Sequence, residues 1–217
     1  MVMQQRAART RKSLISAAAE VFARDGFVTA SLATISKRAG VSNGALHFHF
    51  ENKNALAQAV EDEAAAVVRL IIGQVAQAER GALQSLVDAT HELMRRLADD
   101  VVFRAGFDLS GDAARGGGSE LRLAWQRWIE DALRQAEHKG HLAEGVSVEG
   151  AATAIMAATV GFEVLGGKDK EWLSERKITR FWDLMLPRLA EARQLESVSS
   201  RPSVDGKLPP LLSQETD

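Results

Sequence analysis

The stretch from Thr34 to Lys53, TISKRAGVSNGALHFHFENK, constrains this chain more than any other segment. Two short helical patterns meet at Ala39-Gly40-Val41, and Ser31 and Ser42 each stand where a helix needs an N-terminal cap. Glycine adopts the left-handed conformation that a tight turn between two helices requires. The pattern therefore predicts a helix-turn-helix, with helices at residues 32–39 and over about seven residues after Ser42.

The second helix of this pair carries small, polar and ring side chains, which suit a helix that enters the DNA major groove. We expect its core contacts to be Ala45, Leu46 and either Phe48 or Phe50, with Phe48 helping to hold the shape. The side chains left for the outer face are Asn43, Gly44, His47 and His49.

Two helices flank the motif. Leu14, Ala18 and Val21 follow a helical repeat, which predicts a helix from about residue 8 to Arg24, ended by Asp25-Gly26. If its N-terminus meets a duplex, its backbone N–H groups and nearby arginines converge on phosphates. After the motif, Asn52 is the expected cap of a further helix that runs towards Gly73.

The remaining chain reads as helical throughout, with no alternating strand pattern, so the predicted fold class is all-α. Further helices are expected over residues 83–97, 101–109, 119–140, 148–166 and 172–193, with a glycine-rich loop at 111–118. Pro187 implies a kink or a restart in the last of them. The predicted domains are a DNA-binding head at 1–53, a helical body at 54–196 and a disordered tail at 197–217.

Charge separates the head from the body. Residues 1–55 hold eight Lys or Arg and three Asp or Glu, a net charge of +5, so the rest carries −7 of the total of −2. A basic head on an acidic body suits a head that meets phosphate. The absence of cysteine, of a signal peptide and of an apolar run of about 18 residues leads us to expect a cytoplasmic protein with no membrane contact.

The segments RTRKSLISAAAEVFARDGF and LATISKRAGVSNGALHFHFENKNALA resemble the N-terminal domain of TetR-family repressors over roughly residues 5–60. The FHF sequence, residues 101–106 and a tryptophan about fifteen residues before Gly140 resemble the γ-butyrolactone autoregulator receptors of antibiotic-producing filamentous bacteria. The resemblance implies a homodimer in which each subunit has a three-helix DNA-binding head and a helical body that holds a small-molecule effector.

The resemblance also implies which residues bind. It places the DNA contacts at Arg9, Arg11, Ser42, Asn43, Gly44, His47, His49 and Lys53. Trp125 aligns with the tryptophan that lines the effector cavity of the receptors. An apolar pocket with a few polar anchors is expected from Leu86, Thr90, Met94, Trp125, Ile129, Thr159 and Phe162.

Two departures from the receptors affect specificity. Many receptors have Lys where this chain has Asn43, and Tyr where it has His47. Lysine reads guanine acceptors whereas asparagine suits adenine bidentately, so part of the operator is expected to differ. The LHFHF form also resembles the pseudo-receptors, which answer to antibiotics or to no known ligand, and this leaves the effector open between a γ-butyrolactone or butenolide and an antibiotic.

Other functions fit the sequence less well. His47 and His49 point about 200° apart on a helix, so they do not form a metal pair, and no nucleophile motif or cofactor-binding loop is present. We expect no enzyme activity, metal or cofactor. The apolar helices at 148–166 and 172–193 are the expected dimer seam, against a monomeric bundle. A multidrug-responsive repressor of an efflux pump is the main alternative, followed by an architectural DNA binder and a helical-bundle enzyme.

Overall fold

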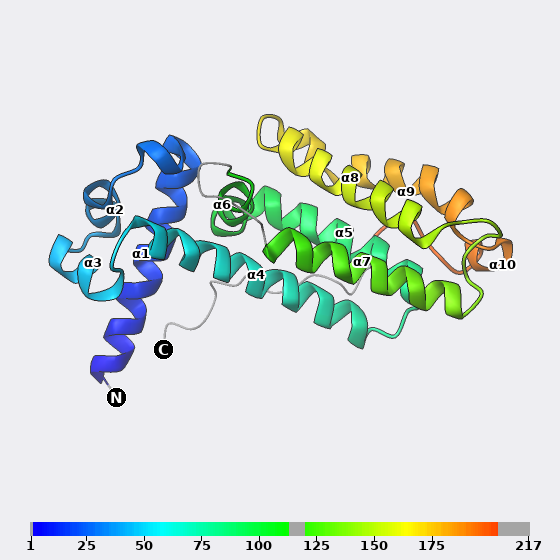
Figure 1. The fold of residues 1–217 in the computed structure, drawn as a ribbon, viewed down its shortest axis with the longest axis horizontal. Coiled ribbons are helices and arrows are strands. Elements are labelled where there is room, and N and C mark those ends of the chain that lie inside the picture. The colour runs from blue at the N-terminus through cyan, green and yellow to red at the C-terminus, as the bar shows by residue number, and fades with distance from the viewer. Residues whose placement is uncertain (1, 113–119, 204–217) are drawn as a thin grey trace. The chain divides into compact units, whose positions relative to one another are not determined.

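The computed structural model describes residues 2–112 and 120–203 of the 217-residue chain. Within these ranges every regular element is a helix, which confirms the all-α prediction (Figure 1). The elements in chain order are α1 (Val2–Thr29), α2 (Leu32–Ala39), α3 (Asn43–His49), α4 (Lys53–Gln77), α5 (Ala82–Asp99), α6 (Val101–Ser110), α7 (Glu120–His138), α8 (Val148–Gly166), the 3-10 helix η2 (Lys170–Leu173), α9 (Glu175–Leu189) and α10 (Ala192–Leu195). Most of the loop predicted at 111–118 lies outside the described residues.

The chain divides into two compact units, and the first comprises Met1–Val68 and Arg96–Trp125. It contains the whole of the predicted DNA-binding segment together with the first part of α4, all of α6 and the start of α7. Helix α6 belongs here because it packs against α1. The boundaries 1–53 and 54–196, drawn by function rather than by packing, stay a prediction.

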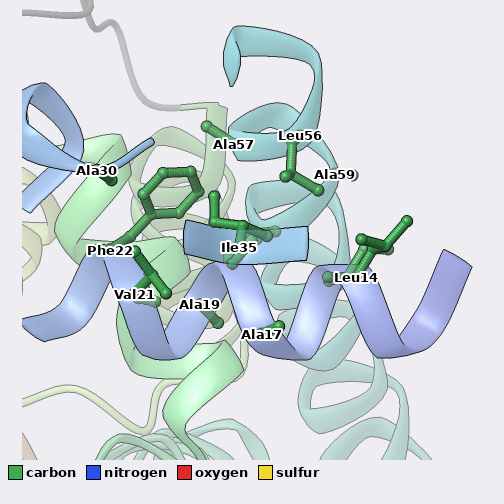
Figure 2. Close-up of a cluster of buried hydrophobic side chains, with 14 of the residues drawn as sticks. Leu14, Ala17, Ala19, Val21, Phe22, Ala30, Ile35, Leu56, Ala57 and Ala59 are labelled. Atoms are coloured by element: carbon green, nitrogen blue, oxygen red, sulfur yellow. The ribbon is translucent and has the colours of Figure 1, made fainter. Parts of the chain in front are cut away.

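The core of the first unit lies between α1, α2, α3, α4 and α6. Figure 2 shows Ile35 of α2 lying across α1, with Phe22 on one side and Leu56 of α4 nearby. Ile35, Leu46 and Leu56 are fully buried, and each such side chain stabilises the fold by about 1.5–3 kcal/mol. This shared core fixes the short helices α2 and α3, which are too short to be stable alone.

Helix α1 differs from its prediction at the N-terminal end. It starts at Val2 rather than near residue 8, and the predicted break at Gly26 is present as a non-helical residue with φ 75°. The backbone N–H groups near Arg9 and Arg11 therefore lie inside the helix, where they bond to the preceding turn. The predicted helix start near residue 8 is therefore wrong, while the phosphate contacts of Arg9 and Arg11 stay a prediction that rests on their side chains.

The second unit comprises Arg69–Arg95 and Gln126–Asp217. The helix predicted over 172–193 is divided into η2, α9 and α10, because Ser174 and Glu191 have extended backbone conformations. Pro187 lies inside α9, which ends two residues later at Leu189. Phe162 of α8 packs edge-on against Phe181 of α9, with ring centroids 5.8 Å apart, which joins these two helices.

The first residues of the tail predicted to be disordered are bound to α5. The backbone N–H of Ser199 donates to Gln84 Oε1 at 2.8 Å, and that of Ser203 donates to Asp88 Oδ1 at 3.0 Å. His91 Nε2 lies 2.9 Å from the carbonyl oxygen of Ser200. Residues 199–203, called the strap below, are therefore ordered, contrary to prediction, while residues 204–217 lie outside the described part.

Helix α8 is long and apolar enough to cross a membrane by length and composition, and 28% of the apolar window is buried. The sequence search missed this because Glu149 and Glu163 interrupt the apolar run. Core helices of soluble proteins pass the same test. Helix α8 therefore presents an exposed apolar face, which includes Val164 and Leu165.

Candidate functional site

The turn between α2 and α3 is set by its backbone. Gly40 has φ 69° and ψ 29°, the left-handed conformation that glycine adopts without strain. The N–H groups of Gly40 and Val41 donate to the carbonyls of Lys37 and Ser36 at 3.2 and 3.0 Å, which is the Schellman arrangement at a helix end. The predicted turn is confirmed, and its bonds set the direction in which α3 leaves.

Helix α3 is capped as the sequence predicts, and Leu46 faces the core as expected. Ser42 Oγ accepts from the backbone N–H of Ala45 at 3.1 Å, and Leu46 is fully buried. Ser42, Asn43, Gly44 and His47 are exposed, and His49 is half-buried. Five of the predicted DNA-binding residues are thus on one short helix and its cap.

Phe48 contradicts its predicted place in the core. Its side chain is 80% exposed, whereas that of Phe50 is 4% exposed. Phe50 ends α3 with φ −139°, and its N–H donates to the carbonyl of Leu46, so both apolar side chains lie on the inner face. Phe48 is two residues from each and points the other way, with its ring edge-on to His49 at 5.2 Å. An exposed phenylalanine on a recognition helix is the residue that the sequence interpretation missed.

Arg9 and Arg11 lie on the exposed side of α1. The guanidinium carbon of Arg11 stands 5.2 Å from the centroid of the Phe50 ring, a cation–π contact. This places the charge of Arg11 beside the C-terminal end of α3. The DNA contacts of Arg9 and Arg11 stay a prediction.

Lys53, the predicted phosphate contact at the start of α4, is bound within the chain. Its ammonium donates to the carbonyl oxygens of Phe27, Val28 and Ala30 at 2.7, 3.0 and 2.8 Å. An ammonium has three N–H donors, so these carbonyls use all of them. The phosphate role of Lys53 stays a prediction, and the structure gives the side chain a role in holding the end of α1.

The predicted effector residues are nearly all buried. Trp125 closes the first unit, whereas the other six belong to the second, and each unit is described by itself. The buried members are Leu86, Thr90, Met94, Trp125, Ile129 and Thr159, while Phe162 is half-buried. Their grouping into one pocket stays a prediction.

The two threonines bond to their own helices. Thr90 Oγ1 donates to the carbonyl of Leu86 at 2.7 Å, and Thr159 Oγ1 donates to that of Ile155 at 2.7 Å. Each hydroxyl proton is therefore in use, and only the lone pairs of the two oxygens remain as hydrogen-bond acceptors. This limits the polar anchors that the sequence interpretation assigned to the pocket.

Trp182 of α9 is a further buried aromatic residue, and it is not among the residues predicted to bind the effector. Its indole N–H is fully buried and has no hydrogen-bond acceptor among residues 2–112 and 120–203. A buried donor without an acceptor costs about 1–3 kcal/mol. A ligand oxygen that reached Trp182 would remove this cost.

These features define a class of protein: a helical, helix-turn-helix DNA-binding regulator with a separate helical body. Residues 14–60 match the family described as bacterial regulatory proteins, tetR family. The A-factor receptor protein of Streptomyces griseus is 31% identical to this chain over 209 residues, which cover 94% of the chain and 72% of the relative. The chain belongs to the TetR family of transcriptional regulators, and it is not an enzyme.

Two solved structures are similar along most of the chain. The crystal structure of a γ-butyrolactone receptor described as ArpA-like has a TM-score of 0.77 and 25% identity, covering 89% of this chain and 94% of the other. The structure of CprB from Streptomyces coelicolor in complex with its operator has a TM-score of 0.75 and 25% identity, with the same two coverages. The resemblance to this group is thus confirmed in fold and in sequence.

Proposed function

We propose that this chain is a ligand-released transcriptional repressor that binds a palindromic operator as a homodimer in the cytoplasm. The observation that carries this proposal is α3, a capped helix with Asn43, His47 and Phe48 exposed, in a chain similar to an operator-bound regulator. The exposed arginines of α1 supply contacts to the DNA phosphates, and such contacts fix the position of the protein along the duplex.

A homodimer is supported by the apolar surface of α8 and α9. Val164 and Leu165 of α8 and Leu184 of α9 are exposed, and Leu184 is 74% exposed. Ala154 and Ala157 add small exposed residues on α8, which allow close helix approach. Two copies of this face bury one another, and a two-fold axis spaces two recognition helices by about 34–36 Å, one turn of the duplex.

The effector is proposed to be a γ-butyrolactone or a chemically related signal, because the similar ArpA-like protein is a γ-butyrolactone receptor. Binding beside Trp125 would favour one of two arrangements of the DNA-binding heads, and release follows from the difference in affinity between them. Control of secondary metabolism is the corresponding cellular role. A multidrug-responsive repressor of an efflux pump is the alternative that a ligand screen separates.

The test is a gel shift at physiological salt with the region upstream of the gene, followed by titration with γ-butyrolactones and, separately, with planar cationic dyes. The proposal expects a preference for a palindrome over scrambled DNA and release by the lactone. Trp125→Ala is expected to abolish release while operator binding persists. Equal binding to scrambled DNA would reject the repressor, and release by dyes alone would favour the multidrug alternative.

The dimer is tested with Leu184→Glu, which places a charge on the exposed apolar face. Sedimentation is expected to show a dimer for the parent chain and a monomer for the variant, with loss of operator affinity. Val28→Glu is the matched control for sedimentation, since the side chain of Val28 is similarly exposed but lies in the first unit. A monomeric parent chain would reject the homodimer.

A further inference from the structure

Asn43, the first residue of α3, is bound to a side chain of the preceding helix. Ser36 Oγ in α2 donates to Asn43 Oδ1 at 2.5 Å. Ser36 is buried, whereas Asn43 is exposed. One end of the asparagine carboxamide is thus fixed to the core of the motif.

The backbone of the turn supports this contact. The N–H of Val41 donates to the carbonyl of Ser36, so Ser36 is also the anchor of the turn. Ser42 then caps α3 through Ala45. Both residues of the Ser36–Asn43 pair are therefore held before DNA is present, and the orientation of the carboxamide costs little to keep on binding.

The atom of the Asn43 carboxamide that faces away from Ser36 determines which base Asn43 can contact. A bidentate contact to adenine needs Oδ1 to accept from N6 while Nδ2 donates to N7. With Oδ1 turned towards Ser36, the group directed away is Nδ2, which carries two N–H donors. Guanine presents two neighbouring acceptors, N7 and O6, in the major groove.

We propose that Ser36 is a positioning residue that makes Asn43 a donor-only reader of guanine. The inference rests on the proposed function, since it requires α3 to enter the major groove.

The alternative arrangement makes the opposite prediction. The hydroxyl of Ser36 has one proton, and the carbonyl of Ala33 is its other acceptor, at 3.1 Å. If the proton went to Ala33, Ser36 Oγ would accept from Asn43 Nδ2 and leave Oδ1 facing outward. An outward oxygen accepts from adenine N6 or cytosine N4.

The experiment selects bound duplexes from a pool of palindromes with randomised half-sites. Asn43→Ala identifies the base pair that Asn43 contacts, because the variant loses discrimination there. Affinities of the parent chain for the four base pairs at that position are then measured by fluorescence anisotropy. The expected preference for guanine over adenine is roughly 5- to 100-fold, the range of a good side-chain contact to a base.

Ser36→Ala is expected to reduce the guanine-to-adenine ratio to near one or to reverse it, because Oδ1 becomes free to accept from adenine N6. Ser36→Thr keeps the hydroxyl and is expected to keep the ratio. In an Asn43→Lys background Ser36→Ala is expected to leave the ratio unchanged, since lysine presents donors without help. This ratio reports base preference, so a general loss of stability does not imitate the result.

The outcomes separate the inference from the proposed function. If the selection yields no sequence that binds more tightly than random DNA, the proposed function itself is rejected. If the parent chain binds specifically but prefers adenine or cytosine at this position, the inference is overturned and the proposed function stands. A guanine preference that Ser36→Ala leaves unchanged, or a base preference that Asn43→Ala leaves unchanged, would overturn it as well.

Discussion

Gly106 of α6 lies against Ala64 of α4 so closely that a Cβ atom on residue 106 would stand 2.4 Å from the Ala64 Cβ and 3.2 Å from the Val60 carbonyl oxygen. Gly106→Ala is therefore expected to separate the two helices. Overpacking of this kind costs about 1–3 kcal/mol, which urea unfolding measures as a lower midpoint.

Gly73 provides the matched control for this substitution. It lies inside α4, and a Cβ atom there meets nothing within 4 Å. Gly73→Ala is expected to raise the free energy of unfolding by up to about 1 kcal/mol, since alanine favours the helix. Equal effects of the two substitutions would contradict the close approach at Gly106.

Lys53 is expected to contribute to stability through its three carbonyl partners, those of Phe27, Val28 and Ala30. Lys53→Met leaves these acceptors without the ammonium and is expected to cost about 1.5–3 kcal/mol, the range for hydrogen bonds to charged groups. Lys37→Met, at an exposed lysine of α2, is the control and should have little effect.

Salt dependence of operator binding tests the phosphate role of Lys53 separately. A lost phosphate contact lowers the slope of log affinity against log salt by about 0.9 for each contact. If Lys53→Met reduces this slope and leaves the free energy of unfolding unchanged, Lys53 contacts phosphate and does not stabilise the end of α1.

Phe48 is expected to matter for DNA and not for folding, because its side chain is 80% exposed. Phe48→Ala should change the free energy of unfolding by less than about 0.5 kcal/mol and weaken operator binding, since an exposed ring can contact a thymine methyl group. Phe50→Ala, at the buried neighbour, should instead cost about 3–5 kcal/mol of stability. Unchanged operator affinity in Phe48→Ala would place the ring outside the interface.

The helix-turn-helix was predictable because its signals are local. Ser31, Gly40, Ser42 and Asn52 each act within three or four residues through caps and a left-handed turn, and all four have the predicted role. The exposure of Phe48 was also predictable from spacing. Leu46 and Phe50 are four residues apart and share one face, so a residue midway between them must point outward.

The roles of Lys53 and of the strap were not predictable, because their partners are distant in the chain. Lys53 bonds to carbonyls 23 to 26 residues earlier. Ser199 and Ser203 bond to α5 side chains 115 residues earlier, and the tail has no apolar pattern that announces this. Gln84, Asp88 and His91 share one face of α5, but polar residues at that spacing more often face water.

Trp182 is expected to act as a hydrogen-bond donor to the effector, since its buried indole N–H has no acceptor in the described residues. Trp182→Phe removes the donor and keeps an aromatic ring. Effector affinity, measured by release of operator DNA, is expected to fall roughly ten-fold, the value of about one hydrogen bond. Unchanged effector affinity in Trp182→Phe would mean that the indole is only core.

His91 is expected to make stability depend on pH. The side chain is 7% exposed, and burial lowers its pKa below the ordinary value of 6.5, while the carbonyl of Ser200 and the carboxylates of Glu175 and Asp88 oppose the shift. Because the folded pKa is lower, the unfolded chain binds more protons just below pH 6.5. The contribution of neutral His91 is thus complete above pH 6.5 and is lost as the pH falls towards the folded pKa.

The measurement is the free energy of unfolding between pH 8 and pH 5 for the parent chain and for His91→Gln. Glutamine can still donate to the Ser200 carbonyl but does not titrate, so its curve should fall less steeply below pH 6.5. His138→Gln, at an exposed histidine at the end of α7, should follow the parent curve. A parent curve and a His91→Gln curve that run parallel through this range would show that the burial of His91 against the strap does not couple to protonation.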